Sequence, residues 1–224
     1  MLELVGVSRR YGVGPTAVVA LDGVDLRVDA GEMVAVMGPS GSGKTTLLSV
    51  AGALDRASAG TVRVAGRALD DLDASSLAEL RRREIGFVFQ DFNLLAALTA
   101  VENVAVPLEL DGMAAPAARA ESLRQLRAVG LEERCDAFPD DLSGGECQRV
   151  AIARALVGDR RLVLADEPTG ALDSESSSTV MRLLREVAGT SRAVVLVTHD
   201  PEAARWADRV VMVRDGRLVE SVRT

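Results

Sequence analysis

The sequence predicts an α/β fold: a buried parallel sheet, a small antiparallel β-subdomain before it, and a helical subdomain inserted into it. Short apolar runs rich in Val, Ile and Leu alternate with segments of helical periodicity, which is typical of strands that are buried on both faces and joined by helices. These runs are residues 31–37, 85–89, 162–165 and 193–197. Each is far shorter than the roughly 18 apolar residues of a membrane-spanning helix.

The remaining strands flank this core. Residues 2–7 and 18–28 show partial alternation of apolar and polar side chains, and residues 60–64 form another short β-type run. We expect these three segments to form the antiparallel sheet. Near the C-terminus, residues 210–214 and 217–222 flank Asp215-Gly216, a dipeptide that favours a tight β-hairpin.

The composition changes between Asp91 and Gly158, where segments rich in Ala, Leu and Arg have helical periodicity. Pro116 suits the first turn of a helix over residues 116–129, because that turn does not need the N–H that proline lacks. We therefore predict one domain of 224 residues. Its core and β-subdomain are residues 1–90 and 158–224, and its helical subdomain is residues 91–157.

Composition and charge narrow the class of protein. The hydrophobic content of 48% is enough for a sizeable core, and 33 acidic against 26 basic residues give a net charge of −7. This charge disfavours nucleic acid as a partner. The first residues hold no basic segment followed by a hydrophobic run, so we expect a cytoplasmic protein. Cys135 and Cys147 are too few for a disulfide framework and are expected to be reduced thiols.

A phosphate-binding loop follows the run 31–37. It fits G-x-x-x-x-G-K-[ST], in which glycines let the backbone approach phosphate oxygens and the next helix points its N-terminus at the anion. Lys44 adds positive charge for the β- and γ-phosphates, and the Thr45 hydroxyl can ligate Mg²⁺. A simple glycine- and serine-rich turn before a helix is the alternative. The predicted nucleotide-binding residues here are Gly38, Pro39, Ser40, Gly41, Ser42, Gly43, Lys44, Thr45 and Thr46.

Two carboxylates end the strand predicted at residues 162–165. Asp166 would hold Mg²⁺ through its water shell, and Glu167, which points in a different direction, could polarise an attacking water. Acidic pairs at strand ends also occur as solvated turn residues. Their position after the string described next favours the functional interpretation.

The string Leu142-Ser143-Gly144-Gly145-Glu146 separates this chain from the many motors, kinases and GTPases that share the phosphate loop. Ser143 is a good N-cap for a helix over residues 146–157, and the two glycines leave the N-terminus of that helix open to an anion. The string is therefore a second phosphate-binding helix start. An independent anion site or a simple capped helix is the alternative.

With these motifs in this order, the chain resembles the ATP-binding cassette (ABC) ATPases over essentially its whole length. IGFVFQDFNLL at residues 85–95 and GGECQRVAIARAL at residues 144–156 resemble the MacB/LolD branch, which acts in macrolide efflux and lipoprotein release. The resemblance implies a P-loop NTPase core of the RecA-like type, with ATP and Mg²⁺ as cofactors.

The resemblance also implies roles for individual residues. Gln90 corresponds to a glutamine that senses Mg²⁺ and the attacking water, His199 to a histidine that contacts the γ-phosphate, and Tyr11 to an aromatic residue that stacks on adenine. Asp173 ends the D-loop, residues 170–173. The predicted catalytic residues are Glu167, His199, Gln90 and Lys44; the predicted metal ligands are Thr45, Gln90 and Asp166; and the predicted nucleotide-binding residues outside the phosphate loop are Tyr11, Ser143, Gly144, Gly145, Glu146 and Asp173.

In this family the string 142–146 meets ATP held by the other subunit, so the resemblance implies a head-to-tail homodimer that ATP closes and hydrolysis reopens. Such a dimer drives a separate integral membrane permease, which places the chain on the inner face of the cell membrane. The alternative is an ABC ATPase that regulates a membrane or extracytoplasmic enzyme without transporting cargo.

Other classes explain the sequence less well. A P-loop kinase or GTPase would leave the string 142–146 unused, and an ABC protein of DNA repair or translation needs long coiled coils or two cassettes in tandem. The chain departs from the branch at Cys147, at Asp141 and at Gly170, where many members have serine. We expect the first two departures to affect subunit contacts or sensitivity to oxidation rather than catalysis.

Overall fold

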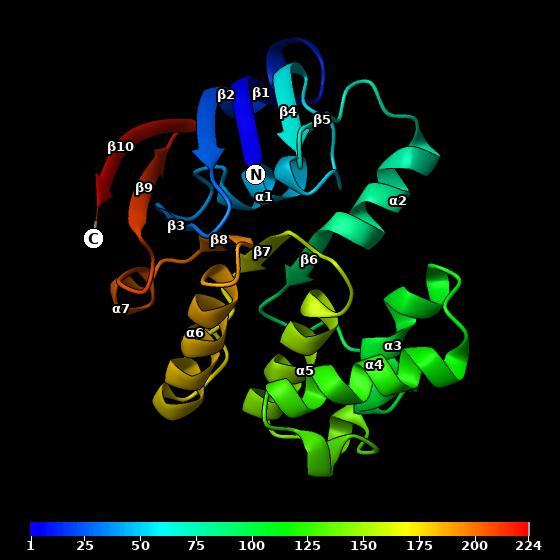
Figure 1. Ribbon diagram of the computed structural model, residues 1–224. Helices are drawn as coiled ribbons and strands as arrows, with labels where there is room; N and C mark the ends of the chain where they lie inside the picture. The colour runs from blue at the N-terminus through cyan, green and yellow to red at the C-terminus, as the bar shows by residue number, and fades with distance from the viewer. Residues whose placement is uncertain (224) are drawn as a thin grey trace.

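A six-stranded sheet forms the centre of the computed structural model, which describes residues 1–223 (Figure 1). Its strand order is β10-β9-β3-β8-β7-β6. The strands from β9 to β6 are parallel, and β10 runs antiparallel to β9. They are β3 (Met33–Met37), β6 (Ile85–Val88), β7 (Leu162–Asp166), β8 (Ala193–Val197), β9 (Arg209–Arg214) and β10 (Arg217–Arg223). The predicted parallel sheet is confirmed.

Side chains of this sheet alternate between two hydrophobic cores. Val34 and Val36 of β3 lie in the core shared with the antiparallel sheet and helix α1 (Lys44–Ala51), whereas Met33 and Ala35 lie in the other core. Successive side chains of a strand point to opposite faces, so a strand covered on both sides is apolar at every position. This explains the uninterrupted apolar runs in the sequence.

The second sheet is antiparallel, as predicted, and lies above the first in Figure 1. Leu2 pairs with Val28 on one side and with Val64 on the other. Its strands, in the order β2-β1-β4-β5, are β1 (Leu2–Tyr11), β2 (Val18–Val28), β4 (Ala59–Val64) and β5 (Arg67–Ala68). The sequence did not indicate β5, because two residues show no periodicity.

The helices fall into groups around the main sheet. Helices α3 (Ala100–Leu110), α4 (Ala115–Ala128) and α5 (Gly144–Leu156) pack on one another at the lower right of Figure 1. The others are α2 (Ala74–Glu84), α6 (Ser174–Ala188) and α7 (Pro201–Ala204), with 3-10 turns η1 (Gly14–Thr16), η2 (Glu132–Arg134) and η3 (Pro139–Asp141). The predicted limits of the helical subdomain, residues 91 and 157, stay predictions. Within residues 1–223, no helix has both the length and the apolar character that crossing a bilayer requires.

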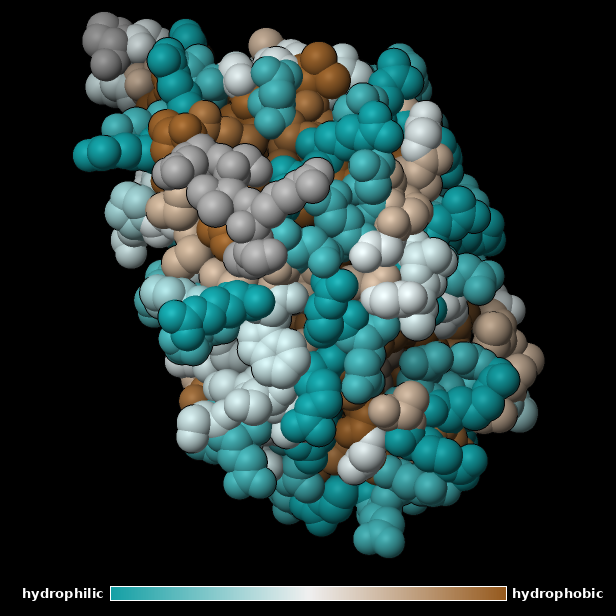
Figure 2. All heavy atoms as spheres, turned by 60° about the vertical axis from the view of Figure 1, so that its left-hand side comes forward, coloured by the Kyte–Doolittle hydropathy of each residue, from teal (hydrophilic) through white to brown (hydrophobic). Residues whose placement is uncertain are grey.

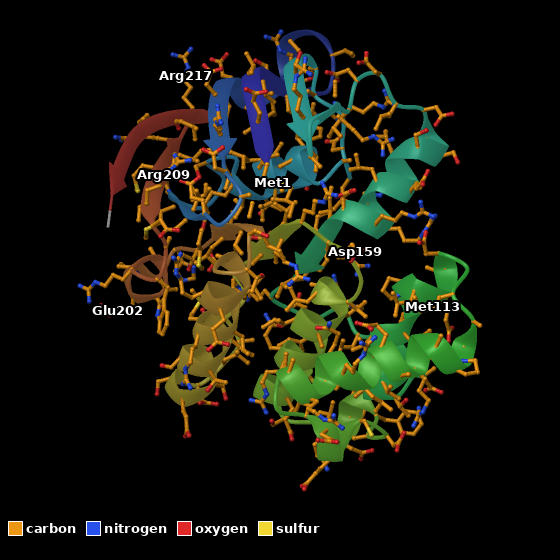
Figure 3. The ribbon with its side chains drawn as sticks, viewed as in Figure 1. Met1, Met113, Asp159, Glu202, Arg209 and Arg217 are labelled. Atoms are coloured by element: carbon orange, nitrogen blue, oxygen red, sulfur yellow. The ribbon has the colours of Figure 1, made fainter. Side chains whose placement is uncertain are left out.

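Strands β9 and β10 form the predicted hairpin, and two ion pairs attach it to the rest of the fold. Arg217 of β10 pairs with Asp22 of β2 at 2.6 Å, and Arg209 of β9 pairs with Glu32, just before β3, at 2.6 Å. Both arginines lie on the left of Figure 3. The hairpin therefore extends the main sheet and also contacts the antiparallel sheet.

Helix α5 lies directly against the edge strand β6. A Cβ atom at Gly86 would stand 2.0 Å from the carbonyl oxygen of Ala155, far inside van der Waals contact. Glycine is therefore required at this position of β6, where another backbone approaches closely. The contact places α5 beside the strand that leads to Gln90.

Candidate nucleotide site

The predicted site residues lie along one edge of the main sheet. Strand β3 leads into the phosphate loop 38–43, β8 leads to His199, β7 ends at Asp166 and Glu167, and β6 leads to Gln90. These four strands are parallel neighbours in the order β3-β8-β7-β6, so their carboxyl ends lie side by side, about 4.8 Å apart. The fold thus assembles residues that are far apart in the sequence, at the edge where open α/β sheets bind ligands.

Close backbone neighbours shape the phosphate loop. A Cβ atom at Gly43 would stand 2.3 Å from the Ala20 carbonyl oxygen, and one at Gly38 would stand 2.2 Å from the Val213 carbonyl oxygen. Gly43 also has a φ of 109°, a left-handed conformation that favours glycine. The loop is therefore held between β2 and β9 in a shape that side chains would prevent.

The groups around this loop suit an anion. Lys44 donates from Nζ to the carbonyl oxygens of Gly38 and Pro39, each at 2.8 Å, so its ammonium group lies over the loop. Among the described residues, the buried Ser42 Oγ has no hydrogen-bond partner. Helix α1 begins at Lys44 after Gly43 and has no side-chain cap, which leaves its first amides available to phosphate oxygens.

Asp166 and Thr45, two of the three predicted metal ligands, lie near each other. Burial raises the pKa of Asp166 above its usual range, while a hydrogen bond from Thr45 and the charge of Lys44 act in the opposite direction. A carboxylate and a hydroxyl are hard oxygen donors, and Mg²⁺ prefers such donors with phosphate oxygens and water. The pair therefore fits Mg²⁺. The Gln90 side chain lies beside Gly170, whose added Cβ would be 3.3 Å from the Gln90 Cδ.

Asp166→Asn is expected to stabilise the protein in a chelating buffer at neutral pH. The pKa of Asp166 is raised in the folded chain, so the protonated carboxyl group favours folding below about pH 4, and this contribution is lost as the pH rises through the folded pKa. Asparagine does not ionise. Urea unfolding should therefore give the variant a larger free energy of unfolding than the unmodified chain at pH 7. This difference should shrink toward pH 4. An unmodified chain that is more stable than the variant at pH 7 would refute this.

Glu167 and His199 form the closest pair of predicted catalytic residues. Nδ1 of His199 and Oε1 of Glu167 are 2.8 Å apart, and a carboxylate there accepts from the ring N–H. The Glu167 backbone has a φ of 45°, and its N–H donates to the Val197 carbonyl oxygen at 2.9 Å. Such left-handed backbone at a non-glycine residue is uncommon and occurs often at functional sites.

A cavity of about 770 Å³ lies beside this pair. Glu167 and His199 form part of its wall together with Gly170, Ser174 and Trp206. Figure 2 shows the side of the molecule with β9, β10 and α7, where hydrophilic residues dominate the lower part and hydrophobic residues gather toward the top. Because Glu167, Ser174 and His199 line the cavity, it offers space for a polar ligand next to the candidate catalytic residues.

The string 142–146 forms the predicted helix start. Ser143 caps α5, because its Oγ accepts from the Glu146 N–H at 3.3 Å while the Ser143 N–H donates to the Glu146 carboxylate at 2.8 Å. Within residues 1–223, the N–H groups of Gly144 and Gly145 have no hydrogen-bond acceptor. Two amides and the positive end of the helix dipole are thus available to an anion.

Two predicted nucleotide-binding carboxylates have structural partners. Glu146 belongs to the capping box of α5 and pairs with Arg134 at 3.3 Å. Asp173 caps α6 by accepting from the Ser176 N–H at 2.9 Å. Hydrogen bonds from the Ser143 and Ser176 backbones hold the pKa values of Glu146 and Asp173 below their usual ranges. A contact of either carboxylate with nucleotide stays a prediction.

Comparison with known proteins identifies the family. A family model described as "ABC transporter" matches residues 21–170. The chain belongs to the ABC transporter family. The match confirms the predicted family. It also confirms the prediction that the chain is an ATPase with the fold of an ABC cassette. The segment that matches runs from β2 through the phosphate loop and the string 142–146 to the D-loop.

Curated relatives extend the likeness over nearly the whole cassette. Macrolide export ATP-binding/permease protein MacB of Marinobacter nauticus is 49% identical over 220 residues, which are 98% of this chain and 34% of the relative. MacB of Escherichia coli strain K12 is 47% identical over 221 residues, 99% of this chain and 34% of the relative. The chain thus spans about a third of the length of these relatives.

Solved structures of one cassette resemble this one closely. The dimeric structure of a post-hydrolysis state of the ATP-binding cassette MJ0796 bound to ADP and Pi has a TM-score of 0.91 and 41% sequence identity, and the match covers 100% of this chain and 98% of that one. A second dimeric structure of MJ0796, a bacterial ABC transporter cassette, matches with the same values. The predicted fold class of the ABC nucleotide-binding domain is confirmed.

Tyr11 of this cassette has a partner on one ring face. The Arg9 guanidinium lies 4.4 Å from the ring centroid, and Asp55 accepts a hydrogen bond from the Tyr11 hydroxyl at 2.7 Å. Asp55 also accepts from Arg9 at 2.8 Å, so the three side chains form one cluster. Tyr11 is still 40% exposed. Stacking on adenine stays a prediction, and it would use the ring face opposite Arg9.

The sequence reasoning missed two residues of this cassette that hold the catalytic segments. Gln148 and Arg154 of α5 donate to backbone carbonyl oxygens on both sides of Gln90. A signal was present for Gln148, since it is a polar side chain beside the apolar run Val150–Ala153, and the structure buries it with that run. The neighbouring Cys147 is buried, and burial raises the pKa of its thiol, which opposes the expected sensitivity to oxidation.

Proposed function

We propose that this chain is the ATP-hydrolysing cassette of a membrane transport complex, in which two copies enclose two ATP molecules head to tail. The hydrogen-bonded pair of Glu167 and His199, at the carboxyl ends of adjacent strands, is the observation that carries the proposal. Hydrolysis of ATP to ADP and phosphate then supplies the free energy that a membrane partner uses.

Glu167 and His199 have complementary tasks in the proposed reaction. The Glu167 carboxylate accepts a hydrogen bond from the attacking water and draws its proton, which makes the water oxygen a better nucleophile. His199 orients that carboxylate through Nδ1, and in its protonated form its second ring N–H can donate to a γ-phosphate oxygen. Lys44 adds positive charge where negative charge develops.

Thr45 and Asp166 would hold Mg²⁺, with Gln90 as the proposed third ligand. Bound Mg²⁺ neutralises negative charge on the β- and γ-phosphates. Thr45 lies close enough to Asp166 to lower the pKa of its carboxyl group, so the two oxygen donors lie near each other before any ligand arrives. This preorganisation lowers the cost of forming the site.

The helix start at Ser143 supports a site completed by a second copy. The Gly144 and Gly145 amides form an anion site on the same chain as the phosphate loop, and the related cassette MJ0796 forms a dimer bound to ADP and Pi. In the proposed dimer these amides bind the γ-phosphate of the ATP held by the partner's loop. Loss of that phosphate removes the link between the subunits, so the dimer reopens.

Gly144→Asp tests the shared site. A Cβ atom at Gly144 would meet the Leu172 side chain at 3.5 Å, an ordinary contact, and a carboxylate in the first turn of a helix is favourable. The monomer should therefore unfold at the same or a higher urea concentration. ATPase activity should fall at least about tenfold, because the new charge repels the γ-phosphate. Full activity in this variant would contradict the shared site.

A mixture of two variants tests the same proposal through a recovery of ATPase activity instead of a loss of it. Chains with Lys44→Ala and chains with Gly144→Asp should each have low activity alone, but a mixed dimer contains one site with an intact loop and an intact helix start. Activity should return to at most about a quarter of the normal rate, since half of the dimers are mixed and each holds one intact site. No recovery after confirmed mixing would count against the head-to-tail arrangement.

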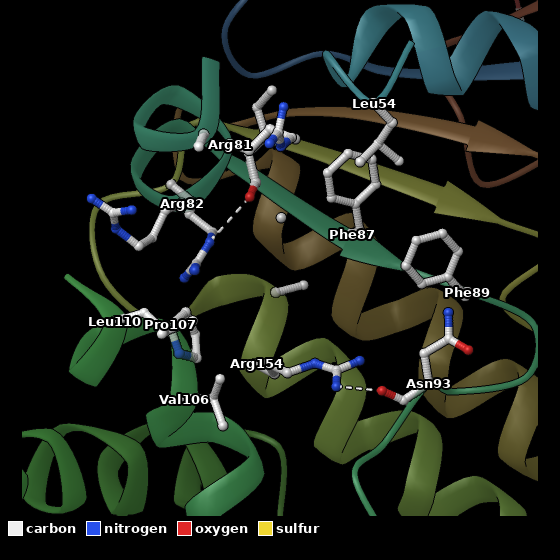
Figure 4. A pocket seen from close by; sticks show the side chains of 15 residues that line it. Leu54, Arg81, Arg82, Phe87, Phe89, Asn93, Val106, Pro107, Leu110 and Arg154 are labelled. Carbon is white, nitrogen blue, oxygen red and sulfur yellow. Dashed lines mark hydrogen bonds between the residues drawn. The ribbon is translucent and has the colours of Figure 1, made fainter. Parts of the chain in front are cut away.

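An apolar groove supports a membrane permease as the second partner. A cavity of about 520 Å³ lies between α2, α3 and α5 beside β6 (Figure 4). Its apolar wall includes Phe87, Phe89, Val106 and Leu110, and Leu110 is 70% exposed. The relatives are named ATP-binding/permease proteins, and two thirds of their length lies outside the match. We propose that an intracellular helix of a permease occupies this groove and holds the cassette at the inner face of the membrane.

The charges of the groove define the chemistry of that helix. Arg154 and Arg160 line it and have no recorded carboxylate partner within residues 1–223, and burial lowers the pKa of Arg160 to about 10. Buried guanidinium groups without a counter-ion are costly. The permease helix is therefore expected to be amphipathic and to carry a carboxylate that meets these arginines.

Leu110→Ser tests the docking groove. Removal of this exposed apolar side chain should leave the ATPase activity of the isolated cassette unchanged but weaken its binding to vesicles that contain the co-purified membrane subunit. Val5→Ser is the matched control, because Val5 is also exposed, at 52%, but lies in β1 away from the groove. Equal retention of both variants on the vesicles would refute the assignment of the groove.

A further inference from the structure

Gln148 occupies an unusual place for an amide side chain. It is fully buried in the middle of α5, in the same helix whose first turn carries Gly144 and Gly145. Its Nε2 donates to the carbonyl oxygen of Pro168 at 2.6 Å and to that of Phe89 at 3.3 Å. Both partners are carbonyl oxygens, so the nitrogen must face them, and no alternative amide orientation can replace these bonds.

The two carbonyl groups belong to the segments that carry catalytic residues. Phe89 directly precedes Gln90, and Pro168 directly follows Glu167. Proline has no backbone N–H, so the segment after Glu167 can be held at this residue only through its carbonyl group. A primary amide is the uncharged side-chain group that offers two N–H donors on one nitrogen, which these two acceptors require.

Arg154 holds the other end of the Gln90 segment. Its guanidinium donates to the carbonyl oxygen of Phe92 at 2.8 Å. It also donates to the carbonyl oxygen of Asn93 at 2.6 Å (Figure 4). Phe92 and Asn93 have φ values of 60° and 49°, a costly conformation that persists only where surrounding contacts impose it. Helix α5 therefore hydrogen-bonds the backbone on both sides of Gln90, through Gln148 before it and through Arg154 after it.

We propose that Gln148 is a positioning residue for ATP hydrolysis, whose amide sets the places of Gln90 and Glu167 relative to the helix that carries Gly144 and Gly145. This inference rests on the proposed function. A shift of α5 when its first turn meets the partner's γ-phosphate would reach both catalytic segments through this one side chain. Among residues 1–223 the buried Gln148 Oε1 has no hydrogen-bond partner, and because an unmet buried acceptor is costly, the two hydrogen bonds donated by Nε2 are what favours an amide here.

Gln148→Met is the primary test, because methionine is unbranched and similar in size but donates no hydrogen bond. The kcat for Mg-ATP hydrolysis should fall at least about tenfold, since small displacements of catalytic groups have large effects on rate. The Kd for a non-hydrolysable ATP analogue should stay within about threefold, because Gln148 does not contact the phosphate loop. A normal kcat, or a Kd that weakens in step with kcat, would overturn the proposal.

Asn103→Leu provides the matched control. Asn103 is an equally buried amide, and it bonds the backbone of Leu95, Leu98 and Thr99 but neither of the carbonyl groups that Gln148 bonds, those of Phe89 and Pro168. The substitution Asn103→Leu should lower the unfolding midpoint but leave kcat within about twofold at a temperature where the variant is folded. An equal loss of kcat in this control would show that Gln148 acts through general stability alone.

Two further measurements keep the proposal testable if Gln148→Met folds poorly. In Gln148→Glu, the buried carboxyl group can donate to Pro168 only when protonated, so the ratio of its kcat to that of the unmodified chain should rise as the pH falls from 8 to 6. A ratio that does not change with pH would contradict the role.

In a Glu167→Gln background, Gln148→Met should cause little further loss of kcat, whereas full additivity would show that Gln148 does not act through Glu167. Absence of ATPase activity in the unmodified chain would instead refute the proposed function.

Discussion

Glu167→Gln is expected to slow ATP hydrolysis by about 10²- to 10³-fold, the usual contribution of a positioned general base. Glutamine has the same shape and its carbonyl oxygen can still accept from His199 Nδ1, so the local geometry should survive. It cannot take a proton from the attacking water. ATP binding should stay within about threefold, because the lost interaction belongs to the transition state.

The same variant should accumulate as an ATP-bound dimer. Slow hydrolysis preserves the γ-phosphate that links the two subunits, so gel filtration with Mg-ATP should show dimers and gel filtration with Mg-ADP should show monomers. Glu186→Gln is the control, since Glu186 is an exposed carboxylate on α6. A Glu167→Gln chain that elutes only as a monomer with Mg-ATP, or that hydrolyses ATP at the normal rate, would disprove the assignment.

Lys44→Ala is expected to weaken ATP binding about 10- to 100-fold, because hydrogen bonds to charged groups contribute about 1.5–3 kcal/mol each. Lys44 reaches the carbonyl oxygens of Gly38 and Pro39 across the phosphate loop, so its ammonium group is already placed over the site. Arg124→Ala on α4 removes a positive charge whose side chain is 72% exposed and should leave the Kd unchanged. An unaltered ATP affinity in Lys44→Ala would refute the assignment of Lys44 to phosphate binding.

The composition permits a direct chemical measurement at this residue. Lys44 is the only lysine among the 224 residues, and the other basic side chains of the Lys and Arg total are arginines. An amine-selective acylating reagent should therefore modify Lys44 and the N-terminus, which peptide mass spectrometry separates. Mg-ATP should protect Lys44 and leave the N-terminal reaction unchanged. Equal labelling with and without Mg-ATP would place the nucleotide elsewhere.

The strands and the phosphate loop were predictable because their signals are local. An apolar run such as residues 193–197 reflects a strand covered on both faces, and it forms β8 with the same bounds. The cap at Ser143 was predictable for the same reason, since a hydroxyl and the N–H three residues later meet within a single turn. In each case the atoms that interact lie close together in the chain.

Helix α2 shows where local signals fail. Its residues 74–84 include three consecutive arginines, and only Leu77 and Leu80 are buried, so its apolar stripe is narrow. Tertiary contacts stabilise it, since Arg82 and Arg83 both donate to Asp111 at the end of α3 at 2.8 Å. The sequence does contain one sign of this helix, the cap residue Asp73, which accepts from the Ser76 N–H.

The types of the catalytic residues and their motifs were evident from the sequence, because glycine, lysine and carboxylate chemistry limits which residues can bind phosphate and Mg²⁺. Only the folded chain decides how they meet. The strand order β3-β8-β7-β6 brings His199 to within 2.8 Å of Glu167, and the packing of α5 on β6 brings Gln148 to the backbone beside Gln90 and Glu167. These contacts join residues 20 to 59 positions apart, and no periodicity or local pattern records such distances. They depend on which strands are neighbours in the sheet, and the burial of the whole core determines this order.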